Sequence, residues 1–377
     1  MTHDVIVVGA GPVGLLLARL LARDGADVLV CERRRGPDAR SRAIGIHPPG
    51  LAALDAAGCG DAVRAEALAL DRGEVHSRGR VLAAVSFGGH RSVLTLAQER
   101  TDAVLRDGLA SSGVGLREGC EVTAVADTGA DVRVQLTDAA GEREESAAFL
   151  VAADGVRSAI RDAMGTRWRP RRGRAWYAMV DVADPAPDRV ARLHCEPGGL
   201  VESFPLPGDR RRWVLRSRGD RPELTAASFR DEIARRLGAA PAIPEDARPA
   251  VFLAAQHRAD PLWSGRIVLL GDAAHETSPI GGQGMNLGWA DARALAPVLL
   301  AARRRGTGAA RPAEGLREYA RARQRSAVRA QRRAAFYMAM GRPVSGIAVP
   351  ARETLLRVLG SPPLRERTAD LVTMRGA

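Results

Sequence analysis

Three glycines near the start of the chain have the spacing of a dinucleotide-binding loop. Residues 9–14 are Gly9, Ala10, Gly11, Pro12, Val13 and Gly14. In this pattern the first glycine permits a tight turn, the second lets the backbone approach a pyrophosphate, and the third lets a helix pack closely on a strand. Glu32 stands about 20 residues further on, where a carboxylate can hold the hydroxyls of an adenosine ribose. Its negative charge disfavours a ribose 2′-phosphate, so the pattern predicts FAD or NAD.

A second glycine-rich segment, residues 271–286, follows a short apolar run at 266–270. It contains Gly271, Asp272, Pro279, Gly282, Gly284, Met285 and Asn286. Apolar residues recur at helical spacing after Gly284, so a helix begins near that glycine. Backbone N–H groups at a helix N-terminus favour a negative charge, and a reduced isoalloxazine that has lost its N1 proton would carry one. Taken alone, the segment is also compatible with a structural turn that binds no ligand.

A third segment, residues 152–161, places Asp154 and Gly155 directly after an apolar run at 147–151. Together the three segments resemble the fingerprints of single-component FAD-dependent aromatic hydroxylases, the group A flavoprotein monooxygenases of the p-hydroxybenzoate hydroxylase type. The resemblance covers roughly residues 3–300. It implies FAD as the cofactor, NADH or NADPH as a transient co-substrate and O2 as the oxidant. It also implies hydroxylation of an aromatic or polyketide-like small molecule through a C4a-hydroperoxyflavin.

The resemblance implies that the residues named above in the 271–286 segment face the cofactor, and it also assigns roles to residues outside the glycine-rich loops. Glu32, with Arg33 beside it, would hold the adenosine ribose, and Asp272 would hold the ribityl chain. Arg42 would lie beside the flavin, and Arg42 and Pro279 are the candidates for a catalytic role. Further contacts with the cofactor are implied for Gln98, Val122 and Asp154, the last of them shared with NAD(P)H.

Activation of a phenol requires a general base or a hydrogen-bond acceptor. His47, five residues beyond Arg42, is one candidate, and a loop histidine without a catalytic role is the alternative. His275 belongs to the 271–286 segment, where bracing the loop is the alternative to chemistry. Candidates for contact with the substrate lie on predicted strands: His194, Glu202, Trp213 and Arg216. Alternation along a strand places only half of such residues on one face of a sheet.

The composition argues against several classes of function. The chain has 377 residues, of which 46% are apolar and 27% charged, as is ordinary for a globular protein. Its net charge of +12 comes from arginines spread along the chain, without the interleaved aromatic residues of a nucleic-acid groove. No lysine occurs, which excludes Schiff-base chemistry and argues against a flavin halogenase. The cysteines are too far apart to suggest a metal site: Cys31, Cys59, Cys120 and Cys195.

An apolar run from Val5 to Ala22 is the candidate for a signal or membrane segment. Asp4 precedes the run, and glycines, Pro12 and Arg19 interrupt it, so we expect neither kind of segment. We therefore expect a cytoplasmic protein, a monomer or homodimer, that binds neither nucleic acid nor a membrane.

The elements that must position these residues indicate an α/β fold. A strand at 5–8, a helix at 14–24 and a strand at 27–31 form a βαβ unit at the start of the chain. Further strands are predicted at 175–183, 190–196, 200–205 and 212–218. A long arginine-rich helix is predicted at 311–340.

The change from a helix-and-strand rhythm to consecutive strands predicts two domains. A Rossmann-like FAD-binding domain of the glutathione-reductase type would comprise residues 1–72, 96–173 and 257–310. An inserted, sheet-rich substrate-binding domain would comprise residues 73–95 and 174–256. Residues 311–377 would form a C-terminal helical segment.

Two other functions are compatible with the same sequence. One is another FAD-dependent oxidoreductase on this fold, such as a dehydrogenase, a reductase or a Baeyer–Villiger-type oxygenase. The other is a flavin-binding protein without catalytic activity. The substrate, the position of oxygen insertion and the choice between NADH and NADPH are left open.

Overall fold

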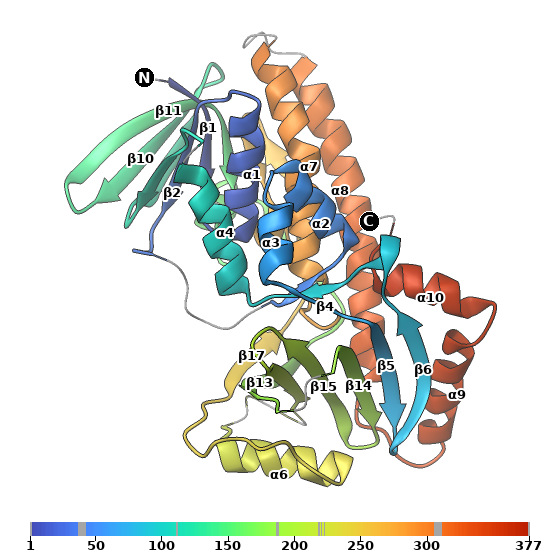
Figure 1. Ribbon diagram of the computed structural model, residues 1–377. Coiled ribbons are helices and arrows are strands. Elements are labelled where there is room, and N and C mark those ends of the chain that lie inside the picture. Colours follow the sequence, from blue (N-terminus) through green and yellow to red (C-terminus); the bar gives the residue numbers. More distant parts are fainter. Residues whose placement is uncertain are drawn as a thin grey trace.

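The structure is a computed structural model, and it describes most of the chain. The described residues are 2–36, 43–110, 112–185, 188–217, 219, 221, 223–304 and 311–375. Arg42 therefore lies outside the described residues. Figure 1 shows two main sheets, one above the other, with a long C-terminal helix running beside both.

The first sheet is built around parallel strands that bring three loops to one edge. Its order is β19-β20-β11-β1-β2-β8, and β20, β11, β1, β2 and β8 are parallel. Their bounds are β1 Thr2–Val8, β2 Val28–Glu32, β8 Gly115–Glu118, β11 Gly141–Ala152, β19 Trp263–Ser264 and β20 Ile267–Leu269. The loops after β1, β11 and β20 therefore leave from the same edge of the sheet.

The two faces of this sheet are covered differently. Val5 and Val7 belong to the apolar cluster formed with α1 (Pro12–Arg23), α4 (Gln98–Ala110) and α7 (Gln283–Arg304). Ile6 and Val8 face the other way, toward the antiparallel strands β9 (Glu121–Asp127) and β10 (Val132–Asp138). Helices on one face and a strand meander on the other confirm the predicted α/β fold.

The second sheet has seven strands drawn from two distant parts of the chain. Its order is β17-β13-β16-β15-β14-β5-β6. The bounds are β5 Arg72–Ser77, β6 Arg80–Ser86, β13 Ala175–Ala183, β14 Val190–Glu196, β15 Gly199–Leu206, β16 Arg210–Arg216 and β17 Ala250–Ala254. The parallel pair of β14 with β5 joins the two parts, and the other neighbours are antiparallel.

One face of the second sheet packs on α6 (Ala226–Leu237) through Phe229 and Ile233, as Figure 1 shows below the sheet. The opposite face, which we call the inner face, carries Tyr177 and Val214. It packs against Ile280 of the 271–286 segment. The inner face is therefore turned toward the glycine-rich segment, whereas the α6 face is turned away from it.

The C-terminal helices brace both sheets. The helix α8 (Arg311–Met340) has the bounds predicted for it, packs on α7, and reaches the inner face through Met338. The helices α9 (Ala348–Gly360) and α10 (Leu364–Val372) pack on β6. Among the described residues, no helix combines the length and apolar character needed to cross a bilayer. The division into an FAD-binding and a substrate-binding domain remains a prediction.

Short elements complete the chain. They are β3 Gly45–Ile46, α2 Pro48–Ala56, α3 Gly60–Glu66, β4 Leu68–Ala69, η1 Gly89–Arg91, β7 Leu94–Thr95, α5 Ala159–Ala163, β12 Arg167–Pro170, β18 His257–Asp260, η2 Gly271–Ala273 and β21 His275–Glu276.

Close contact between α2 and α7 depends on Gly50. A Cβ at this position would overlap Asn286 Oδ1 and would lie 2.8 Å from Trp289 Cε3. Trp289 is fully buried and donates from Nε1 to the Pro12 carbonyl at 3.0 Å, so α7 is fixed to α1 as well. Only glycine lets the first turn of α2 approach this closely.

We expect Gly50→Ala to lower the melting temperature. In an unobstructed helix the same change stabilises by roughly 0.5–1 kcal/mol, so a loss of stability would reveal the clash with Asn286. Thermal denaturation followed by circular dichroism measures the effect. Ala56→Ser, at an exposed position on the same helix, is the control and should change stability by no more than about 0.5 kcal/mol. An equal or raised melting temperature for Gly50→Ala would contradict the packing described.

Candidate functional site

In the loop after β1, only glycine fits at positions 9 and 14, and the backbone at Gly11 is open. Gly9 has φ +106°, and a Cβ there would lie 2.5 Å from the Ala153 carbonyl oxygen. A Cβ on Gly14 would overlap the Gly9 carbonyl oxygen. A Cβ on Gly11 would meet no atom within 4 Å. The backbone at Gly11 is thus accessible to a ligand, while Pro12 begins α1 directly behind it.

Glu32 stands at the end of β2 and is held in its ionised form. Its carboxylate accepts hydrogen bonds from Ala10 N at 2.9 Å, Arg34 N at 2.9 Å and Arg34 Nε at 3.0 Å. Burial raises the pKa of Glu32, but the hydrogen bonds from Arg34 and Ala10 outweigh burial and bring the pKa below its usual value. Arg34, which sequence reasoning missed, contacts this carboxylate, whereas the predicted Arg33 is exposed.

Arg106 is a second residue that sequence reasoning missed. It projects from α4 and donates from Nη2 to the Ala10 carbonyl at 3.4 Å, with an ion pair to Glu118. A guanidinium beside the glycine loop suits a pyrophosphate, since arginine binds phosphate oxygens through paired N–H donors. The only signal in the sequence is the helix itself, which gives no indication that residue 106 meets residue 10.

Asp154 lies directly beside the first glycine loop. A Cβ on Gly9 would be 3.1 Å from Asp154 Cα. Asp154 Oδ2 accepts from Ile160 N at 3.4 Å, whereas Oδ1 is buried without a hydrogen-bond partner among the described residues. Burial raises the pKa of Asp154 in spite of hydrogen bonds from Ser158 and nearby backbone groups. A buried acceptor without a partner is a group that a bound ligand can satisfy.

The Gly271-Asp272 pair closes the same site from the third loop. Gly271 has φ +59°, and a Cβ there would lie 3.2 Å from Val13 Cγ1. A Cβ on Gly288 of α7 would lie 2.6 Å from Val13 Cγ2, so α7 begins beside α1. Asp272 is exposed at this edge. The three segments singled out in the sequence therefore meet at the carboxyl edge of the parallel strands, as ligand sites of open α/β sheets do.

The loop before α7 turns sharply and ends in a buried amide. Gly281 has φ +87° and Gly282 has φ +66°. Gln283 begins α7, is fully buried, and has neither side-chain polar atom paired within the described part of the chain. Asn286 accepts from His47 N at 2.8 Å, and it donates to the carbonyls of Gly45 at 2.9 Å and Gly282 at 2.8 Å. The loop is thereby locked to the segment that leads into α2.

His47 is the residue immediately before α2 and faces this loop. A Cβ on Gly282 would be 3.0 Å from His47 Nε2, and Nδ1 is buried with no hydrogen-bond partner among the described residues. Burial, together with repulsion by Arg333, lowers the pKa of His47 to about 4. His47 is therefore neutral near pH 7 and a weak base there. That property suits a hydrogen-bonding role better than the predicted proton transfer.

The remaining predicted cofactor contacts differ in burial and in the elements that carry them. Pro279 is exposed at its tip, and Gly284 and Met285 are half-buried in the first turn of α7. Gln98 is the first residue of α4 and donates its N–H to the Ala43 carbonyl at 3.1 Å. Val122 packs in the apolar cluster with Cys31 and Cys120. Their roles toward a cofactor remain predictions.

The four predicted substrate residues do not share one face of the second sheet. Glu202 is paired with Leu193 and Val214, which belong to the inner face, and Arg216 is paired with Tyr177 of that face. Trp213 packs with the residues that contact α6, and His194 pairs with Val201 of the same cluster. As strand alternation predicted, only two of the four candidates, Glu202 and Arg216, share the inner face, and contact of any of the four with a substrate remains a prediction.

The strand period explains this division. Residues 213 and 216 lie three apart on β16, an odd number, so their side chains leave opposite faces of the sheet. Trp213 and His194 lie on the α6 side, whereas Glu202 and Arg216 lie on the inner face and are the stronger candidates for contact with a substrate.

His275 braces the loop through a buried ion pair. Its Nε2 contacts Asp291 of α7, and Asp291 also pairs with Arg323 of α8. Burial lowers the pKa of His275, but the charge and hydrogen bond of Asp291 outweigh burial and raise the pKa overall. The arrangement supports the bracing role rather than chemistry.

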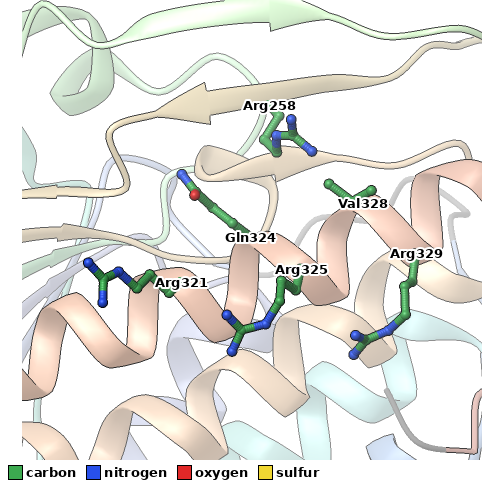
Figure 2. Close-up of a pocket in the computed structure, with 6 residues that line it drawn as sticks. All are labelled: Arg258, Arg321, Gln324, Arg325, Val328 and Arg329. Carbon is green, nitrogen blue, oxygen red and sulfur yellow. The ribbon is translucent and has the colours of Figure 1, made fainter.

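A basic groove of about 500 Å³ lies apart from this site, between β18 and α8. Figure 2 shows Arg321, Arg325 and Arg329 along α8, with Arg258 on the strand above. Burial and repulsion by Arg171 lower the pKa of Arg258. None of the residues predicted to act in the site lines this groove.

No group of His, Cys, Asp and Glu able to hold a metal occurs among the described residues.

Comparison with known proteins identifies the fold and the cofactor. Residues 2–334 match the family described as FAD binding domain. The chain belongs to this family. As an FAD-binding-domain protein it is 36% identical over 304 residues to 6-methylpretetramide 4-monooxygenase of Streptomyces rimosus, covering 78% of this chain and 55% of that protein. It is 33% identical over 314 residues to a 12-dehydrotetracycline 5-monooxygenase/anhydrotetracycline 6-monooxygenase of S. rimosus, covering 78% and 61%.

Solved structures match over the whole chain. The p-nitrophenol 4-monooxygenase of Pseudomonas putida DLL-E4 superposes with a TM-score of 0.87 at 25% identity, covering 100% of this chain and 98% of that one. The anhydrotetracycline hydroxylase of S. rimosus superposes with a TM-score of 0.82 at 28% identity, covering 100% and 77%. The FAD-binding-domain protein thus spans between half and two thirds of the length of those two curated relatives, and nearly all of one solved neighbour.

The residues present fit FAD. The open backbone at Gly11 and the ionised Glu32 suit the pyrophosphate and the adenosine ribose. Unpaired buried polar atoms occur beside the loops where the rest of the cofactor would lie, on Asp154, Gln283 and His47. The N-terminus of α7 offers backbone N–H groups and the positive end of its dipole to a negatively charged ring.

We expect Asp272→Ala to weaken FAD retention. A hydrogen bond to a charged group contributes about 1.5–3 kcal/mol, so the dissociation constant of FAD should rise about 10-fold or more. Fluorescence of released FAD after gel filtration measures the loss. The matched control is Asp61→Ala on α3, an exposed aspartate outside the site. Unchanged retention in Asp272→Ala would remove Asp272 from the site.

The His275–Asp291 pair should make stability depend on pH. The folded protein holds the His275 proton more tightly than the unfolded chain, so the pair stabilises fully below the usual histidine pKa of 6.5. That contribution is lost as pH rises through the raised folded-state pKa. The difference in melting temperature between the natural protein and His275→Gln should therefore narrow as pH rises above 6.5. A difference that is constant from pH 5 to 9 would contradict a charged His275.

Proposed function

We propose that this chain is an FAD-dependent monooxygenase that uses NAD(P)H and O2 to hydroxylate an aromatic or polyketide-like small molecule. The observation that carries the proposal is the meeting of three segments at one sheet edge: the glycine loop, Asp154 and the Gly271-Asp272 pair. The relatives named above support the reaction class, because their names describe monooxygenases acting on tetracycline intermediates and a nitrophenol.

FAD, once reduced by NAD(P)H, would supply the activated oxygen that the reaction transfers. The chain's own residues would bind and orient the cofactor. Gly11 and Glu32 would hold the adenosine diphosphate half, and Arg106 would offset phosphate charge. Asp272 would hold the ribityl chain, and the N-terminus of α7 would favour the negative charge of the reduced ring.

We place the substrate beside the inner face of the second sheet. Ile280 packs on this face, so the loop before α7 and the sheet are in contact. A substrate would approach the flavin ring between them, where Tyr177, Val214 and Ile280 form an apolar surface that excludes water. Such a surface favours planar aromatic molecules.

Three features of the proposal rest on the sequence alone: the location, the oligomeric state and the nicotinamide co-substrate. A cytoplasmic location and a monomeric or homodimeric state remain predictions. NADH and NADPH are both compatible, because the carboxylate of Glu32 acts on FAD and does not select the co-substrate.

The purified protein should be yellow, and adding 1-naphthol should increase both NAD(P)H oxidation and O2 uptake. Absorbance at the nicotinamide band and an oxygen electrode measure the two rates, and mass spectrometry should find a product heavier by one oxygen atom. Absence of bound flavin would contradict every flavin-based function. Oxidation of a substrate without O2 uptake would instead favour the dehydrogenase alternative.

A further inference from the structure

Glu202 is an isolated carboxyl group on the inner face of the second sheet. It is 2% exposed, and its Oε1 is buried without a hydrogen-bond partner among the described residues. Its neighbours across the strands are Leu193 of β14 and Val214 of β16, both apolar. An unpaired buried carboxyl group is costly to keep and is seldom retained without a use.

Glu202 lies on the face of the second sheet that is turned toward the candidate site. Leu200 and Phe204, two residues to either side on β15, point the same way, and Leu200 and Ile280 belong to one apolar cluster. The carboxyl group is therefore on the side of the sheet that packs on the loop before α7, whereas α6 covers the other side. It is a polar group at the apolar surface where the proposed function places the substrate.

We propose that Glu202 is the general base that takes the proton from a phenolic hydroxyl of the substrate. The inference rests on the proposed hydroxylase function. In this step the O–H bond of the phenol breaks, the proton passes to the Glu202 carboxylate, and the bonding electron pair stays on the phenolic oxygen. The phenolate is the more electron-rich ring, and it receives one oxygen atom from O2, with NAD(P)H supplying two electrons through FAD. The second oxygen atom leaves as water.

The surroundings of Glu202 set its basicity. Burial alone raises the pKa of Glu202 to about 8, far closer to that of a phenol than an ordinary glutamate is. Burial raises the pKa of Tyr177 of β13 and of Cys195 of β14, and the negative charge of Glu202 raises both pKa values further. A carboxylate in this position is therefore a stronger base than one in water.

Two arginines of this face, Arg216 and Arg212, have partners other than Glu202. Arg216 of β16 donates from Nη1 to the Met338 carbonyl of α8 at 2.5 Å. Arg212 of β16 pairs with Asp181 of β13, with Nε 2.6 Å from Oδ1. From α8, Tyr337 contributes a hydroxyl whose pKa is raised by burial. Glu202 is thus the carboxyl group of the inner face that keeps an acceptor oxygen unpaired among the described residues.

Glu202→Gln separates a catalytic role from a structural one, because glutamine has the shape and hydrogen-bonding capacity of a neutral glutamic acid but cannot take a proton. The FAD-loaded protein is assayed with phenol, 1-naphthol and 1,3-dihydroxynaphthalene, whose own hydroxyls ionise near the tyrosine value of about 10. In the natural protein kcat/KM for hydroxylation should rise with pH up to about 8. In Glu202→Gln it should fall about 100-fold or more and lose that rise.

Two controls accompany the variant. Glu74→Gln removes a carboxylate from β5 on the opposite face of the same sheet, where Glu74 pairs with Arg72, and should leave the pH profile unchanged. The methyl ether 1-methoxynaphthalene has no phenolic proton, so Glu202→Gln should not slow its oxidation. Glu202→Gln should still bind FAD and consume NAD(P)H and O2 with 1-naphthol, releasing hydrogen peroxide in place of product.

The outcomes distinguish a failure of the proposed hydroxylase function from a failure of the proposed role of Glu202. If the natural protein hydroxylates none of the phenols, the proposed function fails and the role of Glu202 fails with it. If the natural protein hydroxylates 1-naphthol and Glu202→Gln matches its rate and pH profile, Glu202 is a structural residue and the inference alone is overturned.

Discussion

The amide of Asn286 is the contact on which the arrangement of the site depends. It is fully buried and makes three hydrogen bonds with the main chain, to His47, Gly45 and Gly282. A backbone group left unpaired in such a position costs about 1–3 kcal/mol, so the amide fixes the two segments that carry its three partners at once. One side chain in the first turn of α7 thereby sets the loop that precedes it and the segment that leads into α2.

The glycines around this amide show what the sequence could reveal about the site. Gly9, Gly14 and Gly271 were recognisable because backbone sterics allow few other residues there, and the spacing of such glycines is a property of the local chain. The long helix at 311–340 was predictable for a similar reason, since helical periodicity is local. Gly50 was not recognised as a packing residue, because its neighbours Asn286 and Trp289 are distant in the sequence.

The sequence could not determine which strand faces which element. Periodicity separates the two faces of β16 but does not say which of them meets α6, so Trp213 and Arg216 could not be sorted without the sheet order. The same limit applies to Arg34 and Arg106, whose partners Glu32 and Ala10 are fixed by loop geometry and by the docking of α4. The few arginines that contact the site could not be distinguished from the rest, because most of the 56 basic residues can lie on a solvated surface.

The parallel pairing of β5 with β14 has a consequence for the order in which the chain folds. The hairpin of β5 and β6 leaves the ribosome early, but the strand it must join begins only at Val190. Until that residue emerges, an edge of the hairpin is exposed, and closing the long intervening loop carries an entropic cost that local contacts do not offset. The second sheet therefore assembles late during synthesis, and the first sheet gains its own last parallel strand, β20, later still.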